Sequence, residues 1–186
     1  MKDKAAALFL TLSLNIMKIF TKILDTDLPS GAVSETISLS FDERKRGRLK
    51  ITTDNGNDAG IQIERGHVLR HGTVLTNEHA DYLTILASNE AVTTAKVDDA
   101  TLFARGCYHL GNRHVPLQIG EGFLRFQEDY VLENMLHGLG IHAVHEQAPF
   151  EPENGAYAPG TGHHHGHSHD HDDHSHDDGH HHGHSH

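Results

Sequence analysis

Histidine is the residue type in this chain that is best suited to chemistry. The chain has 186 residues and 21 histidines, and thirteen of these fall within its last 24 residues. Neutral imidazole nitrogen binds Ni²⁺, and also Zn²⁺, Cu²⁺ or Co²⁺, so the tail is predicted to bind metal. The tail histidines are His163, His164, His165, His167, His169, His171, His174, His176, His180, His181, His182, His184 and His186.

The spacing of these histidines favours several loose sites over one defined site. Pairs two residues apart recur, as in His167 and His169, and Asp, Ser and Gly separate them. A segment without apolar residues cannot offset the entropy of ordering, so the tail is predicted to be disordered without metal. An engineered affinity tag is the alternative, which the interspersed Asp and Ser disfavour. The tail is therefore predicted to collect ions without strict selectivity.

A second candidate site lies in the stretch Cys-Tyr-His-Leu-Gly-Asn-Arg-His-Val-Pro-Leu-Gln-Ile at residues 107–119. Gly111 and Asn112 are typical of a helix end, which leaves His114 on the exit loop. A lone loop histidine is ordinarily a surface residue, and one imidazole cannot hold an ion alone. A two-fold dimer would supply a second copy of it, and tail histidines could complete the shell.

Other histidines are weaker candidates. His142 and His145 fall on an expected strand at residues 141–145 and could face one side as auxiliary metal ligands, or be ordinary strand residues. Cys107 and His109 are interpreted as packing residues, because Cys107 lies on the apolar stripe of the expected helix. No His-Glu-x-x-His, no Gly-x-x-x-x-Gly-Lys-Ser/Thr and no nucleophile elbow occurs, so no enzymatic activity is expected.

Composition narrows the function classes. The formal net charge is −11, of which five tail aspartates contribute −5; an acidic body without a basic patch argues against a nucleic-acid partner. The single cysteine excludes a disulfide scaffold and fits a reducing, cytoplasmic location. The apolar run at residues 5–14 is too short to span a bilayer, so no membrane association is expected. Residues 1–16 read as a dispensable extension before Met17, with a helical appendage or an export signal as alternatives.

Two domains are expected, in an α+β chain. Residues 17–89 show short alternating segments and polar turns, which indicate a small all-β domain. Residues 90–150 are predicted to follow the order β-α-β-β-α-β, a ferredoxin-like arrangement, with helices that begin at Asp98 or Asp99 and at Asp129. Residues 151–186 are the expected linker and His-rich tail. The strands expected in the first domain are 17–23, 36–41, 49–53, 61–63, 68–69, 73–76 and 82–86, with a charged turn at 42–48, and those in the second are 91–97, 115–119, 123–126 and 141–145.

The stretch at residues 107–119 resembles the signature of the urease accessory protein UreE family, nickel metallochaperones for urease. The resemblance extends over residues 17–158 and includes Leu-Glu-Asn-Met-Leu at 132–136 and Ala-Pro-Phe-Glu-Pro-Glu-Asn-Gly-Ala-Tyr at 148–157. It implies a homodimer with Ni²⁺ between the two copies of His114. It also implies delivery to the urease apoprotein together with accessory proteins that include a GTPase, and a β-rich domain that docks partners.

The sequence departs from the family at one place. Some members carry additional metal-binding histidines where this chain has Glu128 and Tyr130, so the tail is expected to do that work. The rival hypothesis is a histidine-rich nickel or zinc buffer without a dedicated client, and a weaker one is a metal-dependent hydrolase.

Overall fold

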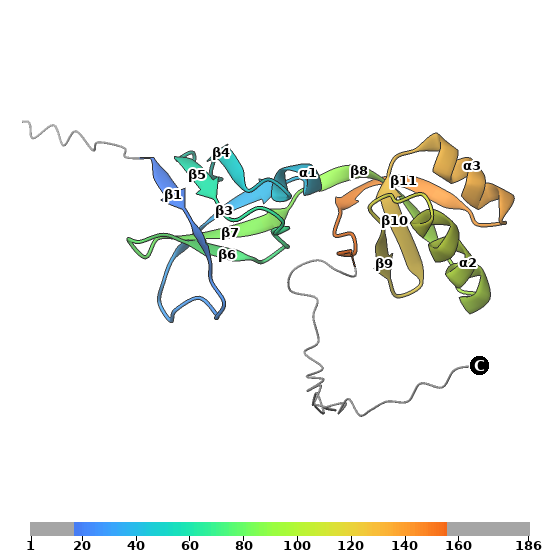
Figure 1. Cartoon of the computed structure of the whole chain (residues 1–186), viewed down its shortest axis with the longest axis horizontal. Helices are drawn as coiled ribbons and strands as arrows, with labels where there is room; N and C mark the ends of the chain where they lie inside the picture. The colour runs from blue at the N-terminus through green and yellow to red at the C-terminus, as the bar shows by residue number, and fades with distance from the viewer. Residues whose placement is uncertain (1–16, 156–186) are drawn as a thin grey trace, which may run out of the picture.

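A computed structural model describes residues 17–155. Figure 1 shows two domains side by side, joined by the long strand β8. No helix within the described residues is long and apolar enough to cross a membrane. The first domain contains β1 (Lys18–Phe20), β2 (Lys22–Ile23), β3 (Ser34–Leu39), α1 (Phe41–Arg44), β4 (Arg48–Thr52), β5 (Asp58–Gln62), β6 (Val74–Thr76) and β7 (Tyr82–Ala87). The second contains β8 (Asn89–Lys96), α2 (Ala100–Gly111), β9 (Gln118–Gly120), β10 (Phe123–Gln127), α3 (Tyr130–Gly138) and β11 (Ala143–Pro149).

The first domain is built from two small sheets, in the orders β1-β5-β4 and β2-β6-β7-β3. The strand expected at residues 17–23 is split at Thr21, where the chain leaves one sheet and joins the other. Every second side chain of β7 is buried, as expected for strands with one face on a core. The shared core is formed by Phe20, Ile37, Leu39, Ile51, Ala59, Ile61, Ile63, Leu69, Leu75, Leu83 and Ile85.

Two local predictions in this domain are wrong. The expected charged turn begins with the short helix α1, because Ser40 and Glu43 form a reciprocal capping box that satisfies the first backbone N–H groups. Phe41 therefore belongs to this helix and not to a strand. The segment expected as a strand at 68–69 pairs with the end of α1 instead, since the Leu69 N–H donates to the Arg44 carbonyl at 3.0 Å.

The second domain confirms the ferredoxin-like prediction. Its sheet has the order β11-β8-β10-β9 with every pair antiparallel, and α2 and α3 pack on it (Figure 1). Asp99 and Asp129 cap the helices as predicted. Several strand boundaries differ, and β11 also continues beyond the expected end to Pro149. β9 begins only at Gln118, and β11 begins at Ala143 because Ile141 is buried where it completes the end of α3.

The glycines of α2 yield a paired prediction. A Cβ at Gly106 would lie 2.7 Å from Leu124 Cδ1 and 3.1 Å from Ile141 Cδ1, whereas one at Gly111 would meet nothing within 4 Å. We expect Gly106→Ala to lower the free energy of unfolding by about 1–3 kcal/mol through overpacking, despite the better helix propensity of alanine. Gly111→Ala should leave it unchanged or raise it by up to about 1 kcal/mol. Urea unfolding of both variants checks this, and equal effects would contradict it.

The domain junction has its own small core. Phe41 from α1 and Phe150, which follows β11, meet edge-on with ring centroids 5.4 Å apart, and Val92 and Ala148 complete the cluster. Residues just after Phe150 contact both domains: the Glu151 N–H donates to the Gln118 side chain at 3.0 Å, and Arg70 Nη1 donates to the Pro152 carbonyl at 2.7 Å. The expected linker therefore starts as a structural part of the junction.

Candidate metal centre

His114 lies where the sequence placed it, just beyond the end of α2. Gly111 is the last helical residue and Asn112 caps the helix, with its N–H directed at the Tyr108 and Leu110 carbonyls. Two turn hydrogen bonds follow the helix: the Arg113 N–H donates to the Leu110 carbonyl and the His114 N–H donates to the Gly111 carbonyl, both at 3.0 Å. The predicted helix stop is confirmed.

The backbone of His114 has a left-handed conformation, with φ of 55°. For a residue with a Cβ this conformation costs about 1–2 kcal/mol, and it persists only where the surroundings impose it. Here the helix end precedes it, and Leu117 is buried three residues later. The imidazole itself is exposed. A side chain that is exposed and yet fixed in direction by its backbone is suited to binding.

A shallow hollow lies beside this loop, against α3. Its volume is about 560 Å³, and Arg113 and Val115 line it together with Val131 and Met135. Val131 is 50% exposed, and Tyr108, which lies one turn from the end of α2, is 65% exposed. Large apolar side chains left open in this way are typical of interaction surfaces.

One chain does not assemble a complete metal site from its described part. Within residues 17–155, no group of three or more His, Cys, Asp or Glu side chains is arranged to hold an ion. Cys107 is half-buried, and burial raises the pKa of its thiol, so the thiolate form that binds metal is disfavoured. Cys107 packs against the core of the second domain, in agreement with its interpretation as a packing residue. His109 is half-buried beside the Tyr108 ring.

His145 lies between two carboxylates. Its Nε2 is 2.8 Å from Glu133 Oε1 and its Nδ1 is 3.6 Å from Glu128 Oε1. The hydrogen bond that His145 donates to Glu133 raises the pKa of His145, and the same contact lowers the pKa of Glu133. Protonated imidazole does not bind metal. Glu128, one of the two departures from the family pattern, therefore takes part in an ion pair.

The His145–Glu133 contact predicts a pH-dependent stability. Its contribution is present when the histidine is charged and Glu133 is ionised. It should fade as the pH rises above about 6.5 through the raised pKa of His145, and as it falls below about 4.3 through the lowered pKa of Glu133. We therefore expect His145→Ala to destabilise the protein near pH 5.5 and to have little effect at pH 9, as measured by urea unfolding. His142→Ala is the control, and a loss that is equal at both pH values would refute the assignment.

His142 and His145 have different neighbours. His142 precedes β11 and its ring packs against His137 at the end of α3, with ring centroids 5.8 Å apart. His145 lies on β11 and faces Glu133. The structure thus does not gather the two expected auxiliary ligands around one point. His137 was not among the predicted ligands, although the two glycines at 138 and 140 are a local signal for a turn that brings it towards His142. The thirteen tail histidines lie outside the described residues.

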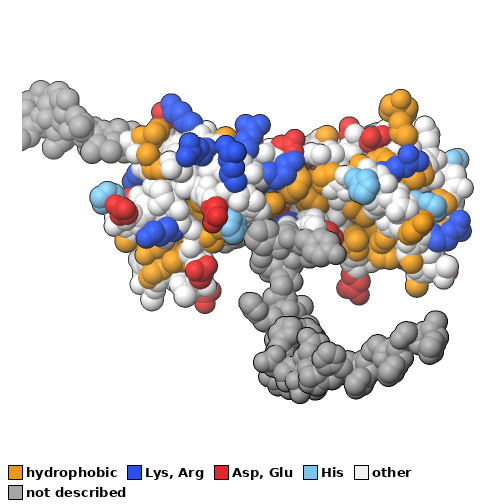
Figure 2. Space-filling model, in the orientation of Figure 1, with side chains coloured by type: hydrophobic (Ala, Val, Ile, Leu, Met, Phe, Trp, Pro, Cys, Tyr) orange, Lys and Arg blue, Asp and Glu red, His pale blue; other side chains and the backbone are white. Residues whose placement is uncertain are grey.

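The first domain carries a cluster of arginine side chains that the overall composition does not indicate. Arg46, Arg48 and Arg65 line a hollow of about 550 Å³, and Figure 2 shows Lys and Arg side chains gathered on this face. The expected absence of a basic patch does not hold here. Arg46 precedes β4, Arg48 begins it and Arg65 follows β5, so the net negative charge of the whole chain does not indicate this cluster.

Comparison with known proteins agrees with this architecture. Residues 20–88 match the family described as UreE urease accessory protein, N-terminal domain, and residues 90–186 match its C-terminal domain. The urease accessory protein UreE of Pseudomonas putida (strain GB-1) is 54% identical over 127 residues, which cover 68% of this chain and 77% of the relative. That of Shewanella halifaxensis (strain HAW-EB4) is 47% identical over 141 residues, covering 76% and 80%.

These matches, together with a β-rich domain followed by a ferredoxin-like domain, define the class as urease accessory proteins. Within that class the chain belongs to the UreE family. The family predicted from the stretch at residues 107–119 is thereby confirmed.

Proposed function

We propose that this protein is a nickel-binding metallochaperone that delivers Ni²⁺ for assembly of the urease metallocentre. The observation that carries the proposal is His114, exposed and held in a left-handed conformation at the end of α2. Imidazole is a suitable ligand for Ni²⁺. The relatives are named as urease accessory proteins, which supports urease as the recipient.

The proposed working unit is a homodimer that shares one ion between two copies of His114. The described part of one chain offers no three-ligand group, and a two-fold axis beside His114 would bring a second imidazole to the same point. The exposed Val131 and Tyr108 near this loop support pairing. The tail histidines would gather further ions and pass one to the shared site.

The ligand set suits transfer. A site made of imidazoles with open positions lets a partner's ligands replace them one at a time, whereas a thiolate cage would favour Zn²⁺ or Cu⁺ over Ni²⁺. The only thiol, Cys107, is half-buried. Transport therefore requires no catalytic group, and the protein acts as a carrier and not as an enzyme. Its site of action is the cytoplasm.

The β-rich domain, residues 17–89, is proposed to dock the urease apoprotein and accessory proteins that include the GTPase. The hollow lined by Arg46, Arg48 and Arg65 supports this role, because it would attract an acidic surface. The second domain, residues 90–150, would hold the metal, and residues 163–186 would collect it. Residues 1–16 are proposed to be dispensable for this task.

Removal of the tail distinguishes this carrier from a histidine-rich buffer. The side chains of all three described cores lie between Phe20 and Phe150, so a chain that ends at Gly162 keeps every one of them. We expect the shortened protein to retain, in calorimetric titration, the one Ni²⁺ per dimer that the two copies of His114 share, and to activate urease apoprotein in a reconstituted system. Loss of nearly all bound metal and of activation would favour the buffer.

A further inference from the structure

His137 and His142 form a second histidine pair on the ferredoxin-like domain. His137 is in the last turn of α3, and His142 directly precedes β11 (Figure 1). Their ring centroids are 5.8 Å apart with an interplanar angle of 73°, and both side chains are exposed. Neither ring has a carboxylate partner among the described hydrogen bonds and ion pairs, unlike His145.

The backbone between the two histidines is rigid. The Gly140 N–H donates to the His137 carbonyl and the Ile141 N–H to the Leu136 carbonyl, both at 2.9 Å, and Gly140 has a φ of +84°. This is the Schellman pattern of helix termination, with its usual apolar contact between the flanking residues. Here those residues are Leu136 and Ile141, which are 0% and 2% exposed. The two Cα positions that carry the imidazoles are thereby fixed relative to each other.

The separation of the rings suits a shared ion. Imidazole nitrogens bind Zn²⁺ at about 2.0–2.1 Å, so two rings on one tetrahedral ion have centroids about 5 Å apart, and about 4.5 Å apart at the right angles that Ni²⁺ and Cu²⁺ prefer. The rings lie 5.8 Å apart, so a shared ion requires them to approach each other by about 1 Å. The position at the C-terminal end of a helix is also favourable, because the helix dipole attracts a cation there.

We propose that His137 and His142 form a surface site for a late first-row divalent cation such as Ni²⁺ or Cu²⁺, separate from the site at His114. Each ring supplies one neutral nitrogen, and water fills the remaining positions. A site with two protein ligands and open positions exchanges its ion readily. His142 therefore acts with His137 across the helix end and not with His145 along the strand. The inference does not require a dimer and does not depend on His114.

The test uses the protein that ends at Gly162, with His114→Ala added so that the other candidate ligand is absent. We expect calorimetric titration with Ni²⁺ to show one ion per chain in this background, and the loss of that ion after either His137→Ala or His142→Gln. Paramagnetic broadening of amide NMR signals by Cu²⁺ should be centred on residues 137–143. His79→Ala, which removes an exposed histidine from a turn of the first domain, is the matched control and should change nothing.

Unchanged titration after His142→Gln, or broadening centred elsewhere, would overturn the pair as a site. Amide spectra of each variant without metal show whether it is folded, so misfolding cannot imitate the expected loss. Titration of the same shortened protein with His114 present measures the shared ion separately. Failure of the pair and failure of the proposed carrier function are therefore distinguishable.

Discussion

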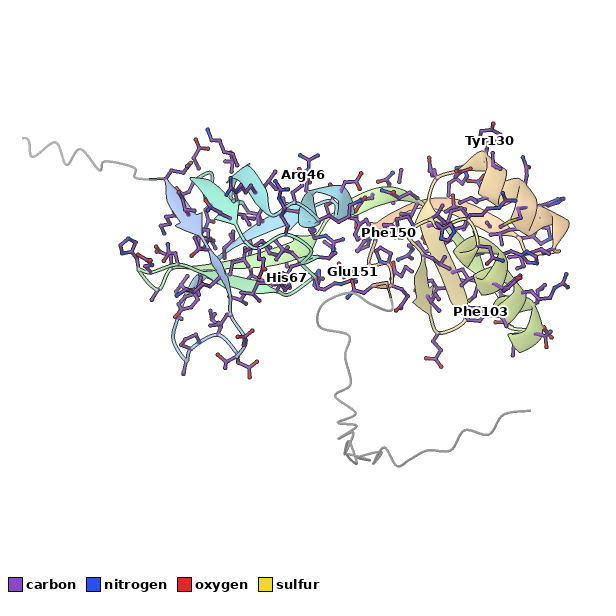
Figure 3. The ribbon with its side chains drawn as sticks, in the orientation of Figure 1. Arg46, His67, Phe103, Tyr130, Phe150 and Glu151 are labelled. Atoms are coloured by element: carbon purple, nitrogen blue, oxygen red, sulfur yellow. The ribbon has the colours of Figure 1, made fainter. Side chains whose placement is uncertain are left out.

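Replacement of Arg44 by methionine is expected to lower the free energy of unfolding by about 3–5 kcal/mol. The Arg44 side chain is 0% exposed, and its partners Phe150 and Glu151 lie at the domain junction (Figure 3). Its Nε donates to the Leu39 carbonyl at 3.2 Å and its Nη1 to the Leu69 carbonyl at 3.1 Å. The guanidinium also donates to the Phe150 carbonyl and forms an ion pair with Glu151. Methionine fills part of the volume but leaves three carbonyls and a carboxylate without this donor.

The charge of Arg44 is held in place by its partners. Burial lowers the pKa of the Arg44 guanidinium, and the neighbouring carboxylates of Glu151 and Glu90 oppose that shift. Removal of the arginine would leave Glu151 with Arg70 as its remaining cationic partner, at 3.3 Å. Loss of one member of a buried pair costs more than the pair contributes, because the carboxylate and the buried carbonyls lose their donor.

Urea unfolding of Arg44→Met beside Arg46→Met checks this prediction. Arg46 is two residues away and exposed (Figure 3), so its replacement should change the free energy of unfolding by no more than about 0.5 kcal/mol. A third variant, Glu151→Gln, keeps an oxygen acceptor and should lose less than Arg44→Met. Similar values for Arg44→Met and Arg46→Met would show that the junction does not depend on the buried guanidinium.

The role of Arg44 could not be predicted from the sequence. Arg44 lies in a run of charged residues at 42–46, and nothing in the local sequence distinguishes the buried residue from the exposed ones. Its ion-pair partner, Glu151, is 107 residues away along the chain. Only the capping box of Ser40 and Glu43 is a local signal, and it marks the helix without saying which arginine is buried. Which arginine is buried depends on packing against residues that are distant in the sequence, and such packing leaves no periodic pattern along the chain.

The ferredoxin-like order, by contrast, follows from local signals. Asp99 and Asp129 precede apolar stripes of helical period, and Gly111 and Gly140 end them, so the elements alternate visibly. His114 could be placed beyond a helix end for the same reason. The positive φ of His114 could not be predicted from the sequence, because non-glycine residues adopt that conformation only under tertiary constraint. The His137–His142 contact was not predicted because the last strand was expected to begin at Ile141, which would have placed His142 on that strand.

The positive φ of His114 allows the imidazole to be removed without loss of stability. We expect His114→Ala and His114→Gly, each in the protein that ends at Gly162, both to abolish the ion shared by the dimer. The loss in affinity should exceed the roughly 10–100-fold caused by removal of a group that only hydrogen-bonds to a metal ligand, because each copy loses a direct ligand. Calorimetric Ni²⁺ titration measures it, with His79→Ala as the control.

Stability should respond differently to the two replacements. Glycine relieves the left-handed strain, worth about 1–2 kcal/mol, but adds freedom to the unfolded chain worth about 0.5–1 kcal/mol. His114→Gly should therefore unfold with the wild-type free energy or up to about 1.5 kcal/mol above it, whereas His114→Ala keeps the strain. If the shared ion survives in His114→Gly, another residue holds it. The other outcome is that both variants lose the ion and His114→Gly is the more stable of the two. In that case the left-handed conformation of His114 has an energetic cost that folding does not require, and metal binding accounts for it.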